Sequence, residues 1–175
     1  MKKYFCNGKR GVCDTTIPCE ECDYKNDQGG RWVDEKSTLK VVLDEGAKMP
    51  TRAHEADAGY DLYSREDAII YNGDSYRFDT GVHVQIPQGY AGVIKSKSGL
   101  NVNYGVQSDG LIDSGYTGSI TVKLYNHGRA AVRIEKGQKI SQLVIVPIVT
   151  PELQQVDSLE ETERGNGGFG SSGKF

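Results

Sequence analysis

Three aspartates stand beside glycines in two short segments, and their carboxylates have the chemistry to bind or activate water. Asp57 and Asp61 flank a glycine in residues 57–61 (DAGYD), and Asp113 lies within residues 109–116 (DGLIDSGY). Glycine permits tight backbone turns, so we expect all three aspartates to lie in turns. A carboxylate held there can bind the water shell of a divalent cation or act as a general base. Aspartate also caps turns without catalytic function, and that interpretation stays open for each residue taken alone.

The glycine-rich segment 165–173 offers backbone N–H groups and hydroxyls that suit phosphate oxygens. It begins with the pattern G-x-G-x-x-G, but a dinucleotide-binding fold needs a preceding strand and a following helix, and neither is predicted. Residues 168–174 match a P-loop until the last position, where Phe175 replaces the required Ser or Thr. The glycines around Ser171 and Ser172 can still wrap a phosphate group. A flexible tail without a ligand is the alternative that composition leaves open.

All four cysteines lie near the start of the chain, at Cys6, Cys13, Cys19 and Cys22. The Cys19-x2-Cys22 spacing is typical of a tetrahedral thiolate site, so we favour a zinc ion bound by all four thiolates. Four thiolates leave no open coordination position, which predicts a structural rather than a catalytic zinc. Two disulfides and free thiols remain the alternatives.

Composition excludes several classes of function. No apolar run approaches the roughly 20 residues that cross a membrane, and the N-terminus lacks the apolar stretch of a secretory signal. We therefore expect a cytoplasmic protein. The 21 basic and 24 acidic residues are mixed along the chain, with a net charge of -3, so no concentrated basic face for duplex nucleic acid is expected.

Alternating apolar and polar residues predict that the elements carrying these side chains are short strands. No segment of ten residues shows a convincing helical period. The expected strands are residues 39–43, 76–79, 81–86, 91–95, 120–125, 132–135 and 140–148, of which the last is nearly continuously apolar and predicted to be buried. Short strands at regular spacing favour an all-β barrel or jelly-roll-like domain.

Changes in composition divide the chain into three predicted parts. Residues 1–36 form a Cys-rich appendage and a turn-rich linker, and residues 37–156 form the β-barrel. Residues 157–175 lose hydrophobic periodicity, become charged and then glycine-rich, and are predicted to be a mobile tail.

Five segments come in an order and at intervals that resemble the motifs of the trimeric dUTPase family, over residues 38 to 173. The segments are 58–64 (AGYDLYS), 97–100 (KSGL), 110–118 (GLIDSGYTG), 137–143 (GQKISQL) and 164–173 (RGNGGFGSSG). One such motif would be weak evidence, whereas five in order are specific.

The resemblance implies a homotrimer of jelly-roll-like subunits, with active sites at the interfaces and the C-terminal tail closing as a lid. Members hydrolyse dUTP to dUMP and pyrophosphate with Mg²⁺ on the triphosphate, which keeps uracil out of DNA and supplies dUMP for thymidylate synthesis. By this match Asp113 deprotonates the attacking water and contacts the sugar 3′-hydroxyl, and Asp61 holds waters of the Mg²⁺ shell. Tyr116 packs under the deoxyribose and excludes a ribose 2′-hydroxyl.

The resemblance also implies which residues bind the rest of the substrate. The hairpin of residues 104–110 reads the uracil edge through backbone hydrogen bonds. Phe169 stacks over uracil, and Arg164 grips the γ-phosphate with the serines of the tail. The remaining implied substrate-binding residues are Lys97, Ser98, Gly99, Gln107, Gly110, Ile112, Gln142, Gly170, Ser171 and Ser172.

The chain departs from the family pattern at a few positions. Lys97 and Lys139 stand where the family usually carries Arg, which keeps the charge but loses the bidentate fork. Gln107 occupies a position often filled by Asn. The Cys-rich appendage has no counterpart in the family core and is of the kind seen in phage-encoded members, which suggests a phage or prophage origin.

Two other functions are alternatives to dUTP hydrolysis. A dCTP deaminase shares the fold, but its reaction needs a glutamate base and a Ser-Arg pair, whereas the water-holding aspartate here lies in the third motif. A regulatory protein is the other alternative: the barrel would respond to nucleotide while the appendage recognises a partner. This function can coexist with catalysis, because the catalytic residues are all present.

Overall fold

The structure is a computed structural model that describes residues 38–168. Within that range the chain forms eleven short strands and one short helix. The elements are β1 (Lys40–Leu43), β2 (Gly59–Tyr63), β3 (Ala68–Ile70), β4 (Ser75–Asp79), β5 (Val82–Gln85), β6 (Tyr90–Ser96), α1 (Ser98–Tyr104), β7 (Val106–Gln107), β8 (Asp109–Ile112), β9 (Thr121–Asn126), β10 (Val132–Ile134) and β11 (Lys139–Pro147). No helix among the described residues is long and apolar enough to span a membrane.

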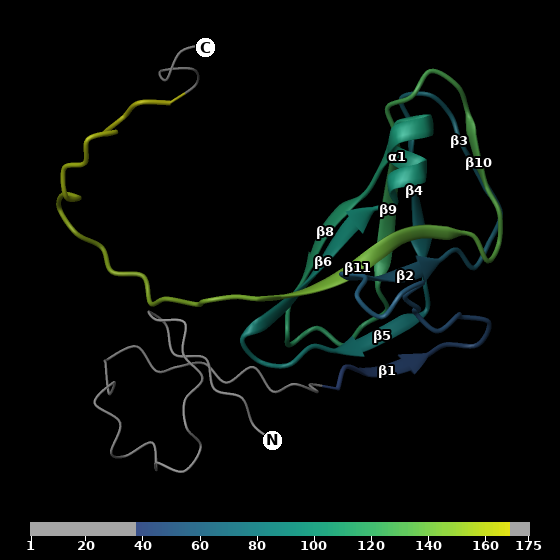
Figure 1. The fold of residues 1–175 in the computed structure, drawn as a ribbon, viewed down its shortest axis with the longest axis horizontal. Helices are drawn as coiled ribbons and strands as arrows, with labels where there is room; N and C mark the ends of the chain where they lie inside the picture. The colour runs from purple at the N-terminus through teal and green to yellow at the C-terminus, as the bar shows by residue number, and fades with distance from the viewer. Residues whose placement is uncertain (1–37, 169–175) are drawn as a thin grey trace. The chain divides into compact units, whose positions relative to one another are not determined.

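The strands form four small sheets, and the largest has the order β2-β11-β6-β8 (Figure 1). All of its neighbouring strands are antiparallel. A three-stranded sheet has the order β4-β9-β7, and two-stranded sheets pair β1 with β5 and β10 with β3. The all-β fold predicted from the alternating pattern is confirmed.

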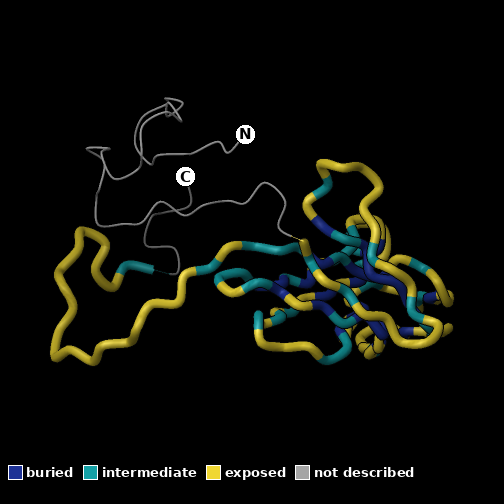
Figure 2. Tube along the Cα trace, turned by 90° about the horizontal axis from the view of Figure 1, so that it is seen from below, coloured by how far each residue is buried: buried dark blue, intermediate teal, exposed yellow. Residues whose placement is uncertain are grey.

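Apolar side chains from the sheets are buried and form the core. The buried residues are dark blue along the chain trace in Figure 2. β9 illustrates why this sequence forms a strand: Val122, Leu124 and Asn126 are buried while the residues between them are exposed. In β11, Leu143 lies opposite Ile94 of β6 and is fully buried. Burying one such aliphatic side chain contributes about 1.5–3 kcal/mol, so these central strands stabilise the frame that carries the site.

The predicted strands are found with their ends shifted by at most one residue, but two expectations about local structure are wrong. Asp61 lies within β2 rather than in a turn, because Gly59 and Tyr60 pair in register with β11. The seven-residue helix α1 is not among the predicted elements, but it is too short to contradict the expectation that no segment of ten residues has a helical period. The outer half of β11 is half-buried, so the predicted burial holds only for its first half.

The predicted hairpin at residues 104–110 is not formed. β7 pairs with β9, whereas β8 pairs with β6, so the two strands belong to different sheets. Ser108 lies between them and is buried, with its amide donating to Ser96 Oγ and its hydroxyl bonded to that of Ser141. These bonds fix the point at which the chain crosses from one sheet to the other. After Pro147 the described residues 148–168 form neither helix nor strand.

Candidate active site

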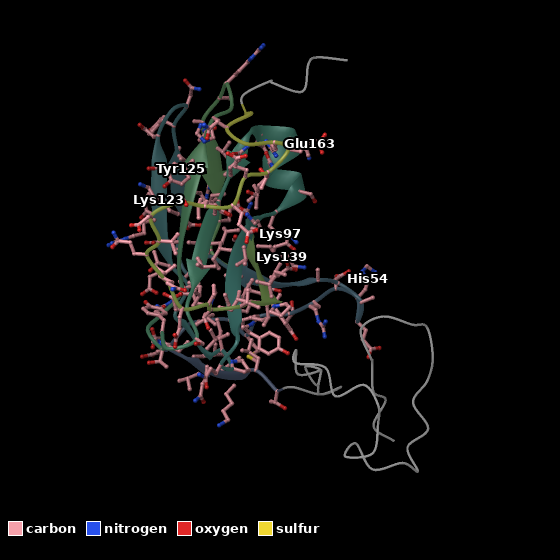
Figure 3. All side chains as sticks on the ribbon, turned by 90° about the vertical axis from the view of Figure 1, so that its left-hand side faces the viewer. His54, Lys97, Lys123, Tyr125, Lys139 and Glu163 are labelled. Atoms are coloured by element: carbon pink, nitrogen blue, oxygen red, sulfur yellow. The ribbon has the colours of Figure 1, made fainter. Side chains whose placement is uncertain are left out.

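Asp61 is the centre of a compact charged cluster on β2. Its side chain is only 6% exposed, and each carboxylate oxygen accepts a bond from a different lysine. Lys97 Nζ lies 2.6 Å from Oδ1, and Lys139 Nζ lies 2.6 Å from Oδ2. Lys97 follows β6, and Lys139 begins β11, where a register irregularity separates it from Ser141. Figure 3 shows the two lysines close together.

The lysines determine the ionisation of Asp61. Burial alone raises the pKa of this carboxyl, but the hydrogen bonds from Lys139 and Lys97 outweigh burial and hold its pKa below the ordinary value. The same bond raises the pKa of Lys139. All three groups are therefore charged at neutral pH, and the cluster carries one net positive charge. That charge favours an anionic ligand such as phosphate.

Gln142 lies next to this cluster in the same row of the sheet, opposite Asp61 on one side and Lys95 on the other. Its side-chain amide donates to the Ser96 carbonyl at 3.1 Å. Gly59 leaves the space that this side chain occupies, since a Cβ at Gly59 would lie 2.6 Å from Gln142 Oε1. The sequence-predicted residues Asp61, Lys97 and Gln142 are thus brought together.

Ser98 and Gly99 continue this half of the site at the start of α1. Both are exposed, and the carbonyl of Lys97 accepts the first helical hydrogen bond from the Asn101 amide. A Cβ added to Gly99 would meet nothing within 4 Å, so packing within this chain does not require glycine there. An open glycine beside a cationic cluster leaves room for a ligand to approach the backbone.

Asp113 lies in a second group, on the turn that follows β8. The amide of Tyr116 donates to the Asp113 carbonyl at 3.0 Å and closes the turn. The Asp113 side chain is exposed, and within residues 38–168 its carboxylate has no hydrogen bond or ion pair. Asp113 therefore occupies the position predicted for it, with its carboxylate available to a ligand or a water molecule.

The ring of Tyr116 is held flat against the same turn. Its hydroxyl donates to the Ser119 carbonyl at 3.0 Å, and the residue stays 45% exposed. A Cβ on Gly118 would lie 2.5 Å from the tyrosine hydroxyl oxygen, so the Tyr116 ring can take this position against the turn only because residue 118 is glycine. The exposed ring beside Asp113 offers a flat surface to a sugar or base.

Asp61 and Asp113 lie at opposite edges of the four-stranded sheet, because Asp61 belongs to β2 and Asp113 follows β8. Three strand spacings separate those edges, which add to about 14 Å. Lys97 follows β6, the neighbour of β8, but lies beyond the other end of that pair of strands, because Lys95 is opposite Asp109 whereas Ile112, just before Asp113, is opposite Gly92. One described chain therefore does not bring Asp113 to the lysine cluster. Two further predicted residues, Gly110 and Ile112, lie in β8 opposite Ile94 and Gly92 of β6.

The other predicted residues lie apart from both groups or outside the described range. Gln107 is exposed and donates to Asn101 Oδ1 at 3.3 Å, and the Nε of Arg164 donates to the Gly167 carbonyl at 2.9 Å. The residues outside the described range are Cys6, Cys13, Cys19, Cys22, Phe169, Gly170, Ser171 and Ser172. Sequence reasoning missed that Lys97 and Lys139 share Asp61; their common positive charge at two motif positions was the only available signal.

The dUTPase family model matches residues 45–173 of this chain. The chain belongs to the dUTPase family. Two curated relatives are named deoxyuridine 5'-triphosphate nucleotidohydrolase. The one from Clostridium tetani is 45% identical over 141 residues, covering 78% of this chain and 97% of the relative. The one from Rattus norvegicus is 37% identical over 175 residues, covering 97% of this chain and 85% of the rat protein.

Solved structures of phage dUTPases share this fold. The Staphylococcus bacteriophage 80alpha dUTPase with dUPNHPP is 37% identical, with a TM-score of 0.75 over 79% of this chain and 100% of the phage chain. A mutant dUTPase from phage phi11 of S. aureus, described with a structural Mg(II) ion, is 35% identical, with a TM-score of 0.66 over 71% and 100% of the chains. The family predicted from the five motifs is confirmed.

Proposed function

We propose that this protein hydrolyses dUTP to dUMP and pyrophosphate, which removes dUTP as a source of uracil in DNA and supplies dUMP for thymidylate synthesis. The observation that carries the proposal is the exposed carboxylate of Asp113 on the same turn as the flat Tyr116 ring. Family membership and the names of the relatives support it.

In the proposed reaction, Asp113 accepts a proton from a water molecule as the water oxygen attacks phosphorus. The new P–O bond forms while the bond to the departing pyrophosphate breaks. Asp113 also contacts the 3′-hydroxyl of the sugar, and Tyr116 packs under the deoxyribose, where a 2′-hydroxyl would collide with the ring. A positioned carboxylate base of this kind accelerates a reaction by about 10²–10⁴-fold.

The triphosphate would lie against the lysine cluster. Lys97, Ser98, Gly99 and Gln142 bind phosphate oxygens, supported by the net positive charge around Asp61. From the tail, Arg164, Ser171 and Ser172 bind the γ-phosphate, while Phe169 and Gly170 cover the base. Phosphoryl chemistry needs mainly positioning and charge neutralisation, which these groups supply.

The uracil would be read by backbone groups near β8. β8 is an edge strand of its sheet, so one row of its N–H and C=O groups has no partner strand there. Gly110 and Ile112 belong to this edge, and Gln107 precedes it. We propose that backbone groups at this strand edge recognise uracil by its hydrogen-bonding pattern, in a space too narrow for a thymine methyl.

The side chains fit Mg²⁺ only in a water-mediated role. Within residues 38–168 no group of three or more His, Cys, Asp or Glu side chains could hold a metal ion, and both oxygens of Asp61 accept bonds from lysines. Mg²⁺ commonly keeps several waters and takes its direct ligands from substrate phosphates. Bound there, it would neutralise charge on the triphosphate, with Asp61 holding its waters. Zinc at the four cysteines stays a prediction.

We further propose a homotrimer in which one subunit supplies Asp113 and another supplies the lysine cluster. The separation of the two groups in one chain supports this arrangement, because Asp61 and Asp113 lie at opposite edges of the sheet and Lys97 and Asp113 lie beyond opposite ends of β6 and β8. A cytoplasmic location, as expected from the sequence, is part of the same proposal.

The test is pyrophosphate release from dUTP, with dCTP, dTTP and UTP measured alongside, for the wild type and Asp113→Asn. Mg²⁺-dependent release from dUTP alone, lost in the variant, is the expected result. Ammonia release from dCTP would indicate a deaminase instead. If wild-type protein binds dUTP without hydrolysing it, the domain is a nucleotide-responsive regulatory protein and the proposal is wrong.

A further inference from the structure

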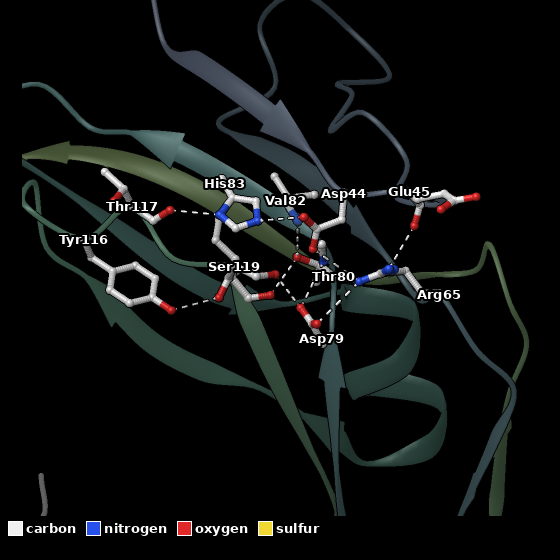
Figure 4. Close-up of polar contacts among 12 residues, drawn as sticks. Asp44, Glu45, Arg65, Asp79, Thr80, Val82, His83, Tyr116, Thr117 and Ser119 are labelled. Atoms are coloured by element: carbon white, nitrogen blue, oxygen red, sulfur yellow. Dashed lines mark hydrogen bonds and ion pairs between the residues drawn. The ribbon is translucent and has the colours of Figure 1, made fainter.

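The ring of His83 lies between two hydrogen-bond acceptors. His83 is on β5, and its side chain is 27% exposed. Nδ1 lies 2.9 Å from the carbonyl oxygen of Thr117, and Nε2 lies 3.2 Å from Oδ1 of Asp44 (Figure 4). A carbonyl and a carboxylate accept hydrogen bonds but donate none. Both contacts are therefore satisfied only when both ring nitrogens carry a proton, as in the imidazolium.

The charged groups around the ring favour that protonated form. Asp44 contacts the ring directly, and Asp79 adds a second negative charge nearby. Arg65 faces both carboxylates, with Nη1 3.6 Å from Asp44 and 3.4 Å from Asp79, and so offsets part of their attraction. The hydrogen bond to the Thr117 carbonyl is the largest cause, followed among the favourable ones by Asp44, and together they raise the pKa of His83.

The carbonyl that His83 holds belongs to the turn of the active site. Thr117 directly follows Tyr116, whose hydroxyl bonds the Ser119 carbonyl. Ser119 is held in turn by a hydrogen bond from its hydroxyl to Asp79. The turn is thus attached at two points to one polar network, and only the His83 attachment depends on a group that titrates near neutral pH.

We propose that protonated His83 is a positioning residue that holds the Tyr116 turn in place and thereby sharpens discrimination between deoxyribose and ribose. This inference rests on the proposed function. The tether is complete below the ordinary histidine pKa and is lost as the pH rises through the raised pKa of His83. Discrimination against UTP should therefore weaken as the solution becomes more alkaline.

The first test needs no catalysis. NMR titration of the ring signals in the full-length protein should give His83 a pKa above the ordinary 6.5, and the amide signals of Thr117 and Gly118 should shift with the same midpoint. Asp44→Asn should lower that midpoint. His127→Gln is the control, because this histidine stacks on Tyr125 and contacts no part of the turn. A His83 midpoint at or below the ordinary value, or amides that do not follow it, overturns the inference.

The second test is the ratio of kcat/KM for dUTP to that for UTP across the same pH range. Using the ratio cancels the ionisation of Asp113 and of the triphosphates, which affect both nucleotides alike. The ratio should fall by about two- to tenfold through the His83 midpoint, the effect of one net hydrogen bond. His83→Gln should flatten the curve, because a neutral amide donates at every pH, while His127→Gln should keep it.

The two tests separate the inference from the function on which it rests. Wild-type protein that hydrolyses no dUTP refutes the proposed function, while the NMR titration still decides whether His83 holds the turn. Normal dUTP hydrolysis with a pH dependence of the ratio that persists in His83→Gln refutes the positioning role and leaves the function intact.

Discussion

Replacing Asp61 with Asn should destabilise the fold measurably, because it removes the charge shared by two lysines while keeping the size of the side chain. The expected loss comes from the bond to Lys97, since Lys139 is 44% exposed and water can replace the carboxylate as its partner. A hydrogen bond to a charged group contributes about 1.5–3 kcal/mol. Lys97 is 28% exposed, so screening places the expected loss near the lower end, about 1.5 kcal/mol.

Thermal unfolding followed by circular dichroism is the assay. A loss of that size lowers the Tm of a chain of this length by about 3–6 °C. Both proteins must be compared at one concentration, because the Tm of an oligomer depends on it. The matched control is Asp109→Asn, which breaks a similar pair with Lys95 in which both side chains are more than half exposed. This control should have the same Tm as the wild type.

The pH dependence gives the prediction a second, independent check. The folded-state pKa of Asp61 lies below the ordinary 3.8, so its stabilisation is complete above that value and is lost as the pH falls through the folded pKa. The difference in Tm should be constant near neutral pH and shrink in acid below that ordinary pKa. If Asp61→Asn melts with the wild type at neutral pH, the two lysine bonds contribute nothing and the reasoning is wrong.

Three other changes test the Tyr116 turn, the apolar core and the requirement for Mg²⁺. Gly118→Ala should raise turnover of UTP relative to dUTP, measured by pyrophosphate release, because the new methyl group would displace the Tyr116 ring. Leu143→Ala should lower the free energy of unfolding in urea by about 2–5 kcal/mol, since Leu143 is fully buried and leaves a cavity. Removing Mg²⁺ with a chelator should abolish turnover, and re-addition should restore it. The Tm of the nucleotide-free barrel should stay unchanged, because residues 38–168 contain no metal-binding cluster.

The strands that could be predicted from the sequence are those with clear alternation. β9 is recognisable because every second residue enters the core. β2 was not, because its glycine and aspartate are typical of turns, and only pairing with β11 makes the segment extended. The family resemblance implies a hairpin over residues 104–110, but β7 pairs with β9 and β8 pairs with β6. Which strand each one pairs with depends on distant segments, which local patterns do not encode.

The candidate site shows the same limit. Asp113 and Tyr116 were predictable because their motif is local and the turn that holds them is closed by its own residues. The partners of Asp61 were not, since Lys97 and Lys139 lie 36 and 78 positions away in sequence (97−61 and 139−61). Their meeting depends on the register of β11 with β2 and on the irregularity beside Lys139. His83 showed no signal, because Asp44 and Thr117 approach it only in the folded chain.

The shared carboxylate offers a physical reason for lysine at the two positions where the family resemblance leads us to expect arginine. An ammonium group is a compact point charge that needs one oxygen, so Lys97 and Lys139 each take one oxygen of Asp61. A guanidinium prefers to bind both oxygens of a carboxylate in a fork, and two of them would compete for the same buried group. Lys97 directly precedes Ser98, and Lys97 and Lys139 bind different oxygens of Asp61, so they do not compete for the carboxylate. Lysine at both positions is therefore compatible with a cationic phosphate site. The two lysines lack the bidentate geometry of arginine, but both can bind the one buried carboxylate of Asp61.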